Sequence, residues 1–303
     1  MRTMIRREER RPRARRRKPL LATLAAVISA ALLALAAPAV ASATPPSSPA
    51  VVSAAKPGTT AAKPTIVLVH GAWAGASSFD PVTTILQAQG YTVVNANVPM
   101  RAMEDDINQV VSYVSALHPE PVVLVGHSYG GFVITGAATR LPNVKGLVYI
   151  DAFAPKAGES IASLAQGSGS LLDVGTDYAK AFDIVPHPGQ DGAGPDFYLR
   201  VDRFREIIAA GVPSVVTKVL AADQSPIAGS VLETPFSGPA AWESLPSWYF
   251  VGTDDKVIPA AGQRQMAQRA GSTIVEGRAP HLAMYGAPLK VSQLIVSAAR
   301  AVG

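Results

Sequence analysis

The sequence predicts an α/β fold in which a doubly wound, mostly parallel β-sheet carries an inserted, largely helical cap. Three observations support this prediction. Short apolar runs typical of buried strands alternate with helical patterns from residue 65 to residue 155. The alternation breaks over residues 156–243, which are rich in Gly, Pro and Ser. It resumes at Trp248, so the middle segment is expected to form a cap over the strand ends.

Four runs of apolar, often β-branched residues predict the strands that precede the cap. The first run, TIVLV, is continuous, as is typical of a strand with both faces buried. The second run ends at Pro99, which lacks the N–H group that a strand ladder needs. We expect these strands at residues 65–69, 91–98, 121–125 and 144–150.

Helices are predicted where apolar residues recur at helical spacing. One pattern places Ile107, Val110 and Val114 on a single face, and an earlier one stops at Gly90. We expect helices at residues 79–89, 105–117, 260–270 and 288–301 and directly after Ser128, strands at 248–251 and 272–275, and helical patches in the cap at 197–210 and 213–222.

The charges of the chain are unevenly distributed. The 303 residues include no cysteine, and 48% of them are hydrophobic, enough for a sizeable core. Residues 1–18 hold ten of the 27 basic residues and two of the 22 acidic ones. The formal net charge of +5 therefore becomes −3 once these residues are set aside. A mildly acidic body gives no electrostatic basis for binding nucleic acid.

The N-terminus has the pattern of an export signal. A basic run, RRPRARRRK, precedes an apolar segment at residues 20–37, and Ala41-Ser42-Ala43 supplies small residues at the positions that a signal peptidase requires. We predict that residues 1–43 are a signal peptide cleaved after Ala43, which makes the protein secreted with no stable membrane insertion. An uncleaved membrane anchor is the alternative. Residues 44–64, rich in Pro and Ala, are expected to be a flexible linker before a domain at 65–303.

A candidate nucleophile lies at the junction of a predicted strand and helix. Gly126-His127-Ser128-Tyr129-Gly130 fits the pattern G-x-S-x-G directly after the strand VVLV and before the helix FVITGAATR. A sharp strand-to-helix turn holds the serine in a strained conformation, leaves room only for small neighbours, and lifts the hydroxyl above the sheet. We therefore predict that Ser128 is a catalytic nucleophile. A glycine-rich turn with a bystander serine is the alternative.

A serine hydroxyl needs a base to remove its proton, and the chain has five histidines. His281 follows the last predicted strand in a loop at its carboxyl end, the edge where sites of open α/β sheets assemble. It also completes the chain order serine, acid, histidine that accompanies such a turn. We predict His281 as the base. The other histidines are His70, His118, His127 and His187.

The base in turn needs a carboxylate that fixes its tautomer and stabilises the imidazolium. Two adjacent aspartates, Asp254 and Asp255, follow the strand WYFV, and side chains of neighbouring residues point in different directions. We favour Asp255. Asp254 and Asp151, which follows the fourth strand, remain alternatives.

Two backbone N–H groups are expected to hold the oxyanion of the tetrahedral intermediate. One is that of Tyr129, the residue after the nucleophile, and the other is that of Ala72 in the loop after the first strand, where small residues let the backbone approach a substrate. Trp73 is a candidate substrate-binding residue of the acyl pocket, with ordinary packing as an equally weighted alternative.

The chain resembles the α/β-hydrolase superfamily in five segments that occur in order: IVLVHGAWAGASSFDPV, VVLVGHSYGG, GLVYIDAFAP, VGTDDKVIP and GRAPHLAM. They are most similar to the branch that holds plant methylesterases, hydroxynitrile lyases and related bacterial secreted esterases. The resemblance implies the α/β-hydrolase fold and places the acid at Asp255, because the family pattern G-T-x-D-x-x-I-P falls there. The cap resembles the family only loosely.

The resemblance also separates esterases from lyases at two positions. The lyases have Thr where this chain has Gly71, and Lys directly after the catalytic histidine, where this chain has Leu282. Both positions follow the esterase pattern. A serine at position 128 likewise argues against the branches that use a nucleophilic aspartate.

These residues together predict a serine hydrolase that cleaves a carboxylic ester or similar acyl bond of a small molecule, with Ser128, His281 and Asp255 as its triad and no metal or cofactor. Two alternatives stay open: a non-catalytic scaffold that binds a small ligand under the cap, and an acyltransferase or perhydrolase that uses the same triad. The sequence gives no indication of the oligomeric state.

Overall fold

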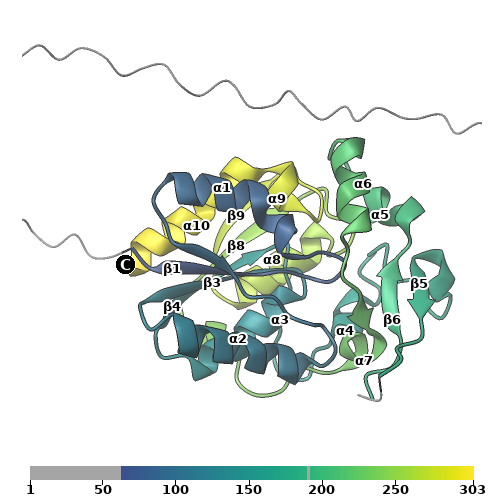
Figure 1. Cartoon of the computed structure of the whole chain (residues 1–303), viewed down its shortest axis with the longest axis horizontal. Helices are drawn as coiled ribbons and strands as arrows, with labels where there is room; N and C mark the ends of the chain where they lie inside the picture. The colour runs from purple at the N-terminus through teal and green to yellow at the C-terminus, as the bar shows by residue number, and fades with distance from the viewer. Residues whose placement is uncertain (1–62, 190–191) are drawn as a thin grey trace, which may run out of the picture. The chain divides into compact units, whose positions relative to one another are not determined.

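The computed structural model describes residues 63–189 and 192–303, and within them a central sheet is sandwiched between helices (Figure 1). The sheet has six strands in the order β2-β1-β3-β4-β8-β9, and each neighbouring pair is parallel. The predicted doubly wound, parallel α/β fold is confirmed.

Three of the four central strands are buried along their whole length, as is typical of strands covered on both faces, and β4 is buried except at Lys145. Every residue of β1, β3 and β8 is buried, whereas the edge strands β2 and β9 are partly exposed. The predicted strand at 91–98 is much shorter in the structure. The bounds of the six strands are Thr65–Val69 (β1), Val93–Asn95 (β2), Val122–His127 (β3), Val144–Ile150 (β4), Ser247–Gly252 (β8) and Thr273–Gly277 (β9).

Helices cover the two faces of the sheet. Helix α1 packs on α10 at one face, and α2 packs on α3 at the other (Figure 1). Local signals explain two of the starts: α2 has three acidic residues in its first turn, which favour a helix N-terminus, and α10 begins at Pro288. These helices and their neighbours are Asp80–Ala88 (α1), Met103–Leu117 (α2), Gly130–Ala137 (α3), Ala260–Arg269 (α8), Ala283–Gly286 (α9) and Pro288–Val302 (α10).

The order of the strands reverses at β1, which lies between β2 and β3. Loops that leave the carboxyl ends of β1 and β3 therefore diverge, and ligands of open α/β sheets bind in the crevice that this divergence creates. The loop after β1 contains Ala72, and the turn after β3 contains Ser128. The topology thus brings two of the predicted site segments to the same edge.

The cap lies beyond this edge, between the end of β4 and the start of β8 (Figure 1). Its helices are Ile161–Ala165 (α4), Val201–Ile207 (α5), Ser214–Ala222 (α6) and Gly229–Glu233 (α7). It also contains a three-stranded antiparallel sheet of Phe182–Val185 (β5), Asp196–Leu199 (β6) and Ile227–Ala228 (β7), which the sequence analysis did not predict. The helix predicted at 197–210 is wrong at its start, because residues 197–199 pair in β6 and α5 begins at Val201.

The predicted signal peptide and most of the predicted linker lie outside the described residues. In the described part of the chain, no helix has the length and apolar character needed to cross a membrane.

Candidate active site

Ser128 lies in the strained turn that the sequence motif predicts. Its φ angle is +53°, a left-handed conformation that costs free energy for a residue with a side chain. The flanking glycines are required sterically: a Cβ at Gly130 would lie 2.3 Å from the Val69 carbonyl oxygen, and one at Gly126 would lie 2.6 Å from the Gly130 oxygen. Helix α3 begins two residues after Ser128, so the positive end of its dipole lies at this serine.

His281 and Asp255 form a buried pair. The Nδ1 atom of His281 lies 2.8 Å from Oδ2 of Asp255, and both side chains are excluded from solvent. Because a carboxylate can only accept, Nδ1 carries the proton and Nε2 is left as the basic nitrogen. This Nε2 atom is buried and has no hydrogen-bond partner among the described residues. The pair therefore presents an available base.

Asp255 is held in place by three further donors. Its Oδ1 atom accepts the backbone N–H groups of Val257 at 2.7 Å and Ile258 at 3.0 Å, and its Oδ2 atom accepts Nε2 of Gln263 at 2.8 Å. These contacts fix the orientation of the carboxylate toward His281. Asp254, the adjacent alternative, is instead ion-paired with Arg278 at 3.4 Å.

The third alternative, Asp151, is buried in the same region but does not hydrogen-bond His281. Its Oδ1 atom accepts the Gly252 N–H group at 2.6 Å. The structure thus brings His281 to Asp255 rather than to Asp254 or Asp151.

The loop that carries His281 is joined to the end of β3 by a second histidine. Nε2 of His127 lies 2.8 Å from the His281 carbonyl oxygen, and the two rings are 4.7 Å apart between centroids. Since a carbonyl can only accept, His127 donates from Nε2. Burial lowers the pKa of His127 well below its ordinary value and keeps it neutral. The residue before Ser128 therefore anchors the backbone of His281. Ser128 itself has no hydrogen bond to His281 among those of the described residues, a contact that often tightens only when a substrate binds.

The remaining histidines are engaged elsewhere. His70 is buried after β1, where its Nδ1 atom lies 3.0 Å from the Gly71 oxygen. His118 contacts Glu120, and His187 contacts Asp196 in the cap.

The loop after β1 lies against Ser128. A Cβ at Gly71 would be 2.5 Å from the Cβ of Ser128, so only glycine allows this approach. Ala72 and Tyr129 both line the pocket beside the serine. Within residues 63–189 and 192–303, the backbone N–H groups of Ala72 and Tyr129 donate no hydrogen bond. They are therefore available to an acceptor.

A buried carboxyl group, that of Asp106, forms a hydrogen bond with the residue that follows Ser128. Asp106 in α2 accepts the Tyr129 hydroxyl at 2.5 Å and the Met100 N–H group at 2.9 Å. Burial raises the pKa of Asp106 to about 6. The side chain of Tyr129 is thus fixed by a buried hydrogen bond next to Ser128.

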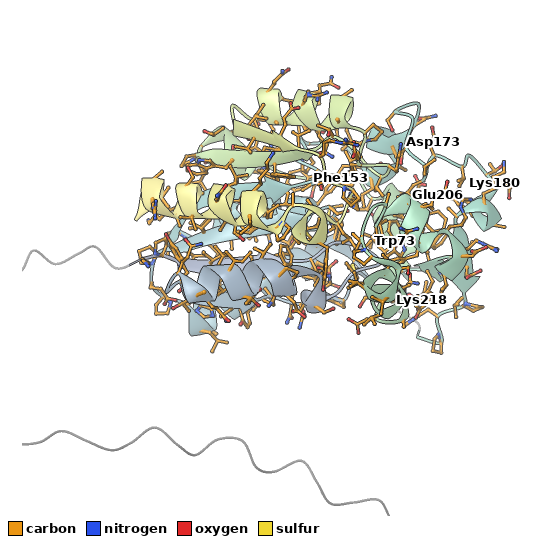
Figure 2. All side chains as sticks on the ribbon, turned by 90° about the horizontal axis from the view of Figure 1, so that it is seen from above. Trp73, Phe153, Asp173, Lys180, Glu206 and Lys218 are labelled. Atoms are coloured by element: carbon orange, nitrogen blue, oxygen red, sulfur yellow. The ribbon has the colours of Figure 1, made fainter. Side chains whose placement is uncertain are left out.

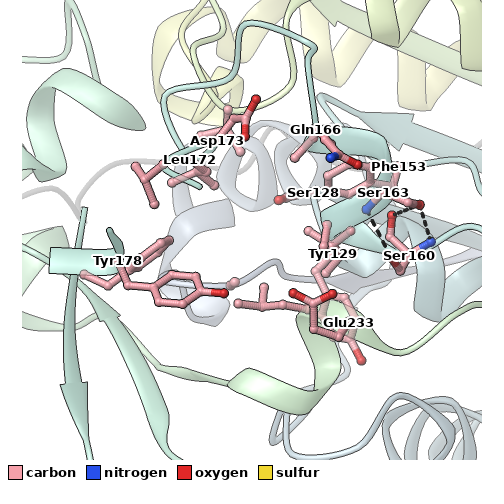
Figure 3. Close-up of a pocket in the computed structure, with 18 of the residues that line it drawn as sticks. Ser128, Tyr129, Phe153, Ser160, Ser163, Gln166, Leu172, Asp173, Tyr178 and Glu233 are labelled. Carbon is pink, nitrogen blue, oxygen red and sulfur yellow. Dashed lines mark hydrogen bonds between the residues drawn. The ribbon is translucent and has the colours of Figure 1, made fainter. Parts of the chain in front are cut away.

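The pocket at Ser128 has a volume of about 380 Å³ and lies between the strand ends and the cap. Figure 3 shows Ser128 facing this space, with Leu172, Tyr178 and Glu233 of the cap around it. The described residues that line it include two carboxylates, Asp173 and Glu233, but no Lys, Arg or His.

Trp73 lines this pocket and is also part of the packing, so both interpretations of this residue agree with its position. Its indole Nε1 donates to the Phe197 oxygen at 2.9 Å, and its ring lies 5.4 Å from that of Phe182. Trp73 and Phe153 lie where the sheet meets the cap (Figure 2).

Sequence reasoning missed two polar residues that hold the site together, His127 and Gln263. The position of His127 next to the nucleophile was a signal, because a residue there must point under the turn. Gln263 gave none, since a glutamine in a helix is ordinarily exposed. Among the described residues, no group of three or more His, Asp or Glu side chains is arranged to hold a metal ion.

The fold and this site define a member of a known family. A family model described as the alpha/beta hydrolase family matches residues 66–294. The chain belongs to the α/β hydrolase family.

Three similar proteins specify the resemblance. A carbendazim hydrolyzing esterase of Nocardioides sp. (strain SG-4G) is 40% identical over 32% of this chain, a match that spans only 46% of that enzyme. Methylesterase 17 of Arabidopsis thaliana is 24% identical over 79% of this chain and 93% of its own length. Among solved structures, an extracellular alpha/beta-hydrolase from a Paenibacillus species, described as homologous to tobacco salicylic acid binding protein 2, has a TM-score of 0.63 at 23% identity, covering 78% of this chain and 98% of that one. The predicted resemblance to plant methylesterases and bacterial esterases is confirmed.

Proposed function

We propose that this protein is a serine hydrolase that cleaves carboxylic esters of small molecules through an acyl-enzyme. The observation that carries the proposal is the buried His281–Asp255 pair, in a loop anchored to the residue that precedes Ser128. The basic Nε2 atom of His281 has no hydrogen-bond partner in the described part of the chain. Relatives named as an esterase and a methylesterase support the class of substrate.

In the first half-reaction, Nε2 of His281 takes the proton of the Ser128 hydroxyl while Oγ forms a bond to the ester carbonyl carbon. The carbonyl oxygen becomes an oxyanion that accepts the N–H groups of Ala72 and Tyr129. The tetrahedral intermediate then expels the alcohol, which receives the proton from His281. The acyl group remains esterified to Ser128.

In the second half-reaction, His281 takes a proton from water, and the resulting hydroxide adds to the acyl carbon. Collapse of this intermediate returns the proton to Ser128 and releases the carboxylic acid. Asp255 keeps the proton on Nδ1 and stabilises the imidazolium in both halves.

The cavity indicates the size and charge of the ester. About 380 Å³ lies within the range of small-molecule pockets, and the aromatic and aliphatic lining suits an apolar acyl or alcohol group. With two carboxylates and no cation along the described lining, we propose an uncharged ester. We also propose that the protein acts outside the cell, as its N-terminal signal pattern predicts.

The test is hydrolysis of p-nitrophenyl acetate and p-nitrophenyl butyrate by residues 44–303. The rate is measured by the appearance of p-nitrophenol. Ser128→Ala is expected to lower kcat by about 10⁴-fold or more, because loss of a triad member has effects of this size. Ser292→Ala is the matched control, since Ser292 is a buried serine of α10 outside the site. An unchanged rate in Ser128→Ala would remove this residue from the mechanism.

A further inference from the structure

Asp151 is a buried carboxyl group that the proposed mechanism does not use. It follows β4 directly, is fully excluded from solvent, and has a φ angle of +43°. Its carboxyl packs flat against Gly252: a Cβ at that glycine would lie 2.6 Å from Oδ1 and 2.8 Å from Oδ2. Asp151 therefore has a strained backbone, and its carboxyl group lies against the backbone of β8. The packing around it must stabilise this conformation.

Gln263 lies beside Asp151 and joins it to the candidate triad. The amide nitrogen of Gln263 donates to Oδ2 of Asp255 at 2.8 Å and to the Ile258 oxygen at 2.7 Å. Both of its N–H groups are therefore used, and a flipped amide would set oxygen against two acceptors. The orientation of the side chain is fixed, and Oε1 must find its partner elsewhere.

Two buried oxygens are left without a donor in this cluster. Oδ2 of Asp151 and Oε1 of Gln263 both lack a hydrogen-bond partner among the described residues. An ionised Asp151 and an amide oxygen can only accept, so they cannot satisfy each other. A single proton on Oδ2 removes both deficits, because a carboxylic acid can donate to the amide oxygen.

The electrostatic surroundings favour that proton. The charged and titratable groups that face Asp151 are Asp255 after β8 and Tyr249 within β8, and the N–H group of Ala283 approaches from α9. Burial raises the pKa of Asp151 well above its ordinary value, and the charge of Asp255 raises it further. The contacts with the Gly252 N–H group, the Gln263 side chain and the Ala283 N–H group lower it by less, so the net shift is upward. Two ionised carboxylates in one buried cluster would repel strongly, so one of them stays neutral.

We propose that Asp151 stays protonated and donates its Oδ2 proton to Oε1 of Gln263, which makes it a positioning residue for the triad. The chain of contacts runs from Asp151 through Gln263 and Asp255 to Nδ1 of His281. Its effect on turnover rests on the proposed function, whereas its protonation does not. In this row of four side chains, Asp151, Gln263 and His281 each donate a hydrogen bond in the direction of Asp255. The only charge in the row therefore lies on the Asp255 carboxylate.

The first experiment detects the proton directly. An infrared difference spectrum between the wild-type protein and Asp151→Asn at pH 8 should contain the carbonyl band of a neutral carboxylic acid. The difference spectrum between the wild-type protein and the control variant Asp254→Asn should lack this band. This measurement needs no substrate, so it decides the protonation even if the protein hydrolyses no ester. A pair of carboxylate bands in place of the acid band would overturn the proposal.

The second experiment measures kcat with p-nitrophenyl butyrate. Asp151→Asn keeps a neutral donor of the same shape and should stay within about threefold of the wild type. Asp151→Ala leaves Oε1 of Gln263 without a donor and should lower kcat by about 10- to 100-fold, as small displacements of catalytic groups do. Equal losses in Asp151→Asn and Asp151→Ala would contradict the proposal.

A double variant separates positioning from general stability. Gln263→Met removes both ends of the amide, so Asp151→Ala should have little further effect on kcat when it is added to Gln263→Met. Losses that multiply would show that Asp151 acts independently of Gln263 and would overturn the proposal. Should every protein fail to hydrolyse esters, the proposed function fails, and the infrared result still stands on its own.

Discussion

The two walls of the pocket are built differently. On the sheet side, Ser128, His281 and Asp255 are all buried and are fixed by backbone contacts that tolerate only glycine at several positions. On the cap side, Asp173 and Glu233 are exposed side chains of an inserted segment. The sheet edge therefore holds the candidate catalytic groups in place, whereas Asp173 and Glu233 contribute charge to the pocket and have no hydrogen bond or ion pair with the three triad candidates. Variants on the two sides should therefore fail in different ways.

The largest effect is expected from the acid of the triad. Asp255→Asn should lower kcat by about 10⁴-fold for every ester, because an amide at this position favours the wrong tautomer of His281. Asp254→Asn is the matched control, since Asp254 is bonded to Arg278 instead, and it should be nearly neutral. A large loss in Asp254→Asn together with an active Asp255→Asn would reverse the assignment.

A second variant tests how tightly the sheet side is packed. Gly71→Thr adds a Cβ that would lie 2.5 Å from the Cβ of Ser128, and it should lower kcat by about 10²-fold through displacement of the nucleophile. In Gly75→Ala the new Cβ would meet nothing nearer than 4.0 Å, so this control should retain activity. The measurement is kcat together with the thermal midpoint of each variant. Full activity of Gly71→Thr would show that the loop has room that the structure does not give it.

The smallest effect is expected on the cap side and concerns substrate choice alone. We expect the double variant Asp173→Asn/Glu233→Gln to raise kcat/KM for a carboxylate-bearing ester about fivefold relative to its neutral isostere at low salt, since two repelling charges are removed. The ratio should approach that of the wild type in 0.5 M salt, because exposed charges are screened.

The control for this variant is Glu206→Gln, which removes an exposed carboxylate of α5 that does not line the pocket (Figure 2). An equal loss of kcat for all esters in the cap variant would contradict the inference that the two cap carboxylates affect only the choice of substrate.

Much of the sheet side could be predicted because its signals are local. The turn at Ser128 is defined by five consecutive residues, and the strands before it, β1 and β3, contain the continuous apolar runs IVLV and VVLV. The cap could not be predicted in the same way. Phe197 fits a helical pattern with the residues that follow it, yet it pairs with Ile184 of β5 and Ile227 of β7, and such long-range partners leave no trace in a local pattern.

The polar residues around the triad candidates could not be predicted from the local sequence pattern either. Gln263 follows Asp255 by eight residues within a polar helix, and only the fold shows that this one side chain is buried. Asp151 is an alternative partner for His281 on sequence grounds. In the structure its carboxyl group faces the backbone of Gly252 and not His281.

The strands that flank the cap are neighbours: Ile150 of β4 pairs with Phe250 of β8. Because the two strands run parallel, the inserted segment leaves β4 at the carboxyl edge of the sheet and must return to the opposite edge before it enters β8. β4 and β8 therefore pair directly in the parallel ladder, whatever the length of the segment between them. One architecture of this kind can acquire new substrates through changes within residues 156–243, about 29% of the sequence, that leave its chemistry alone.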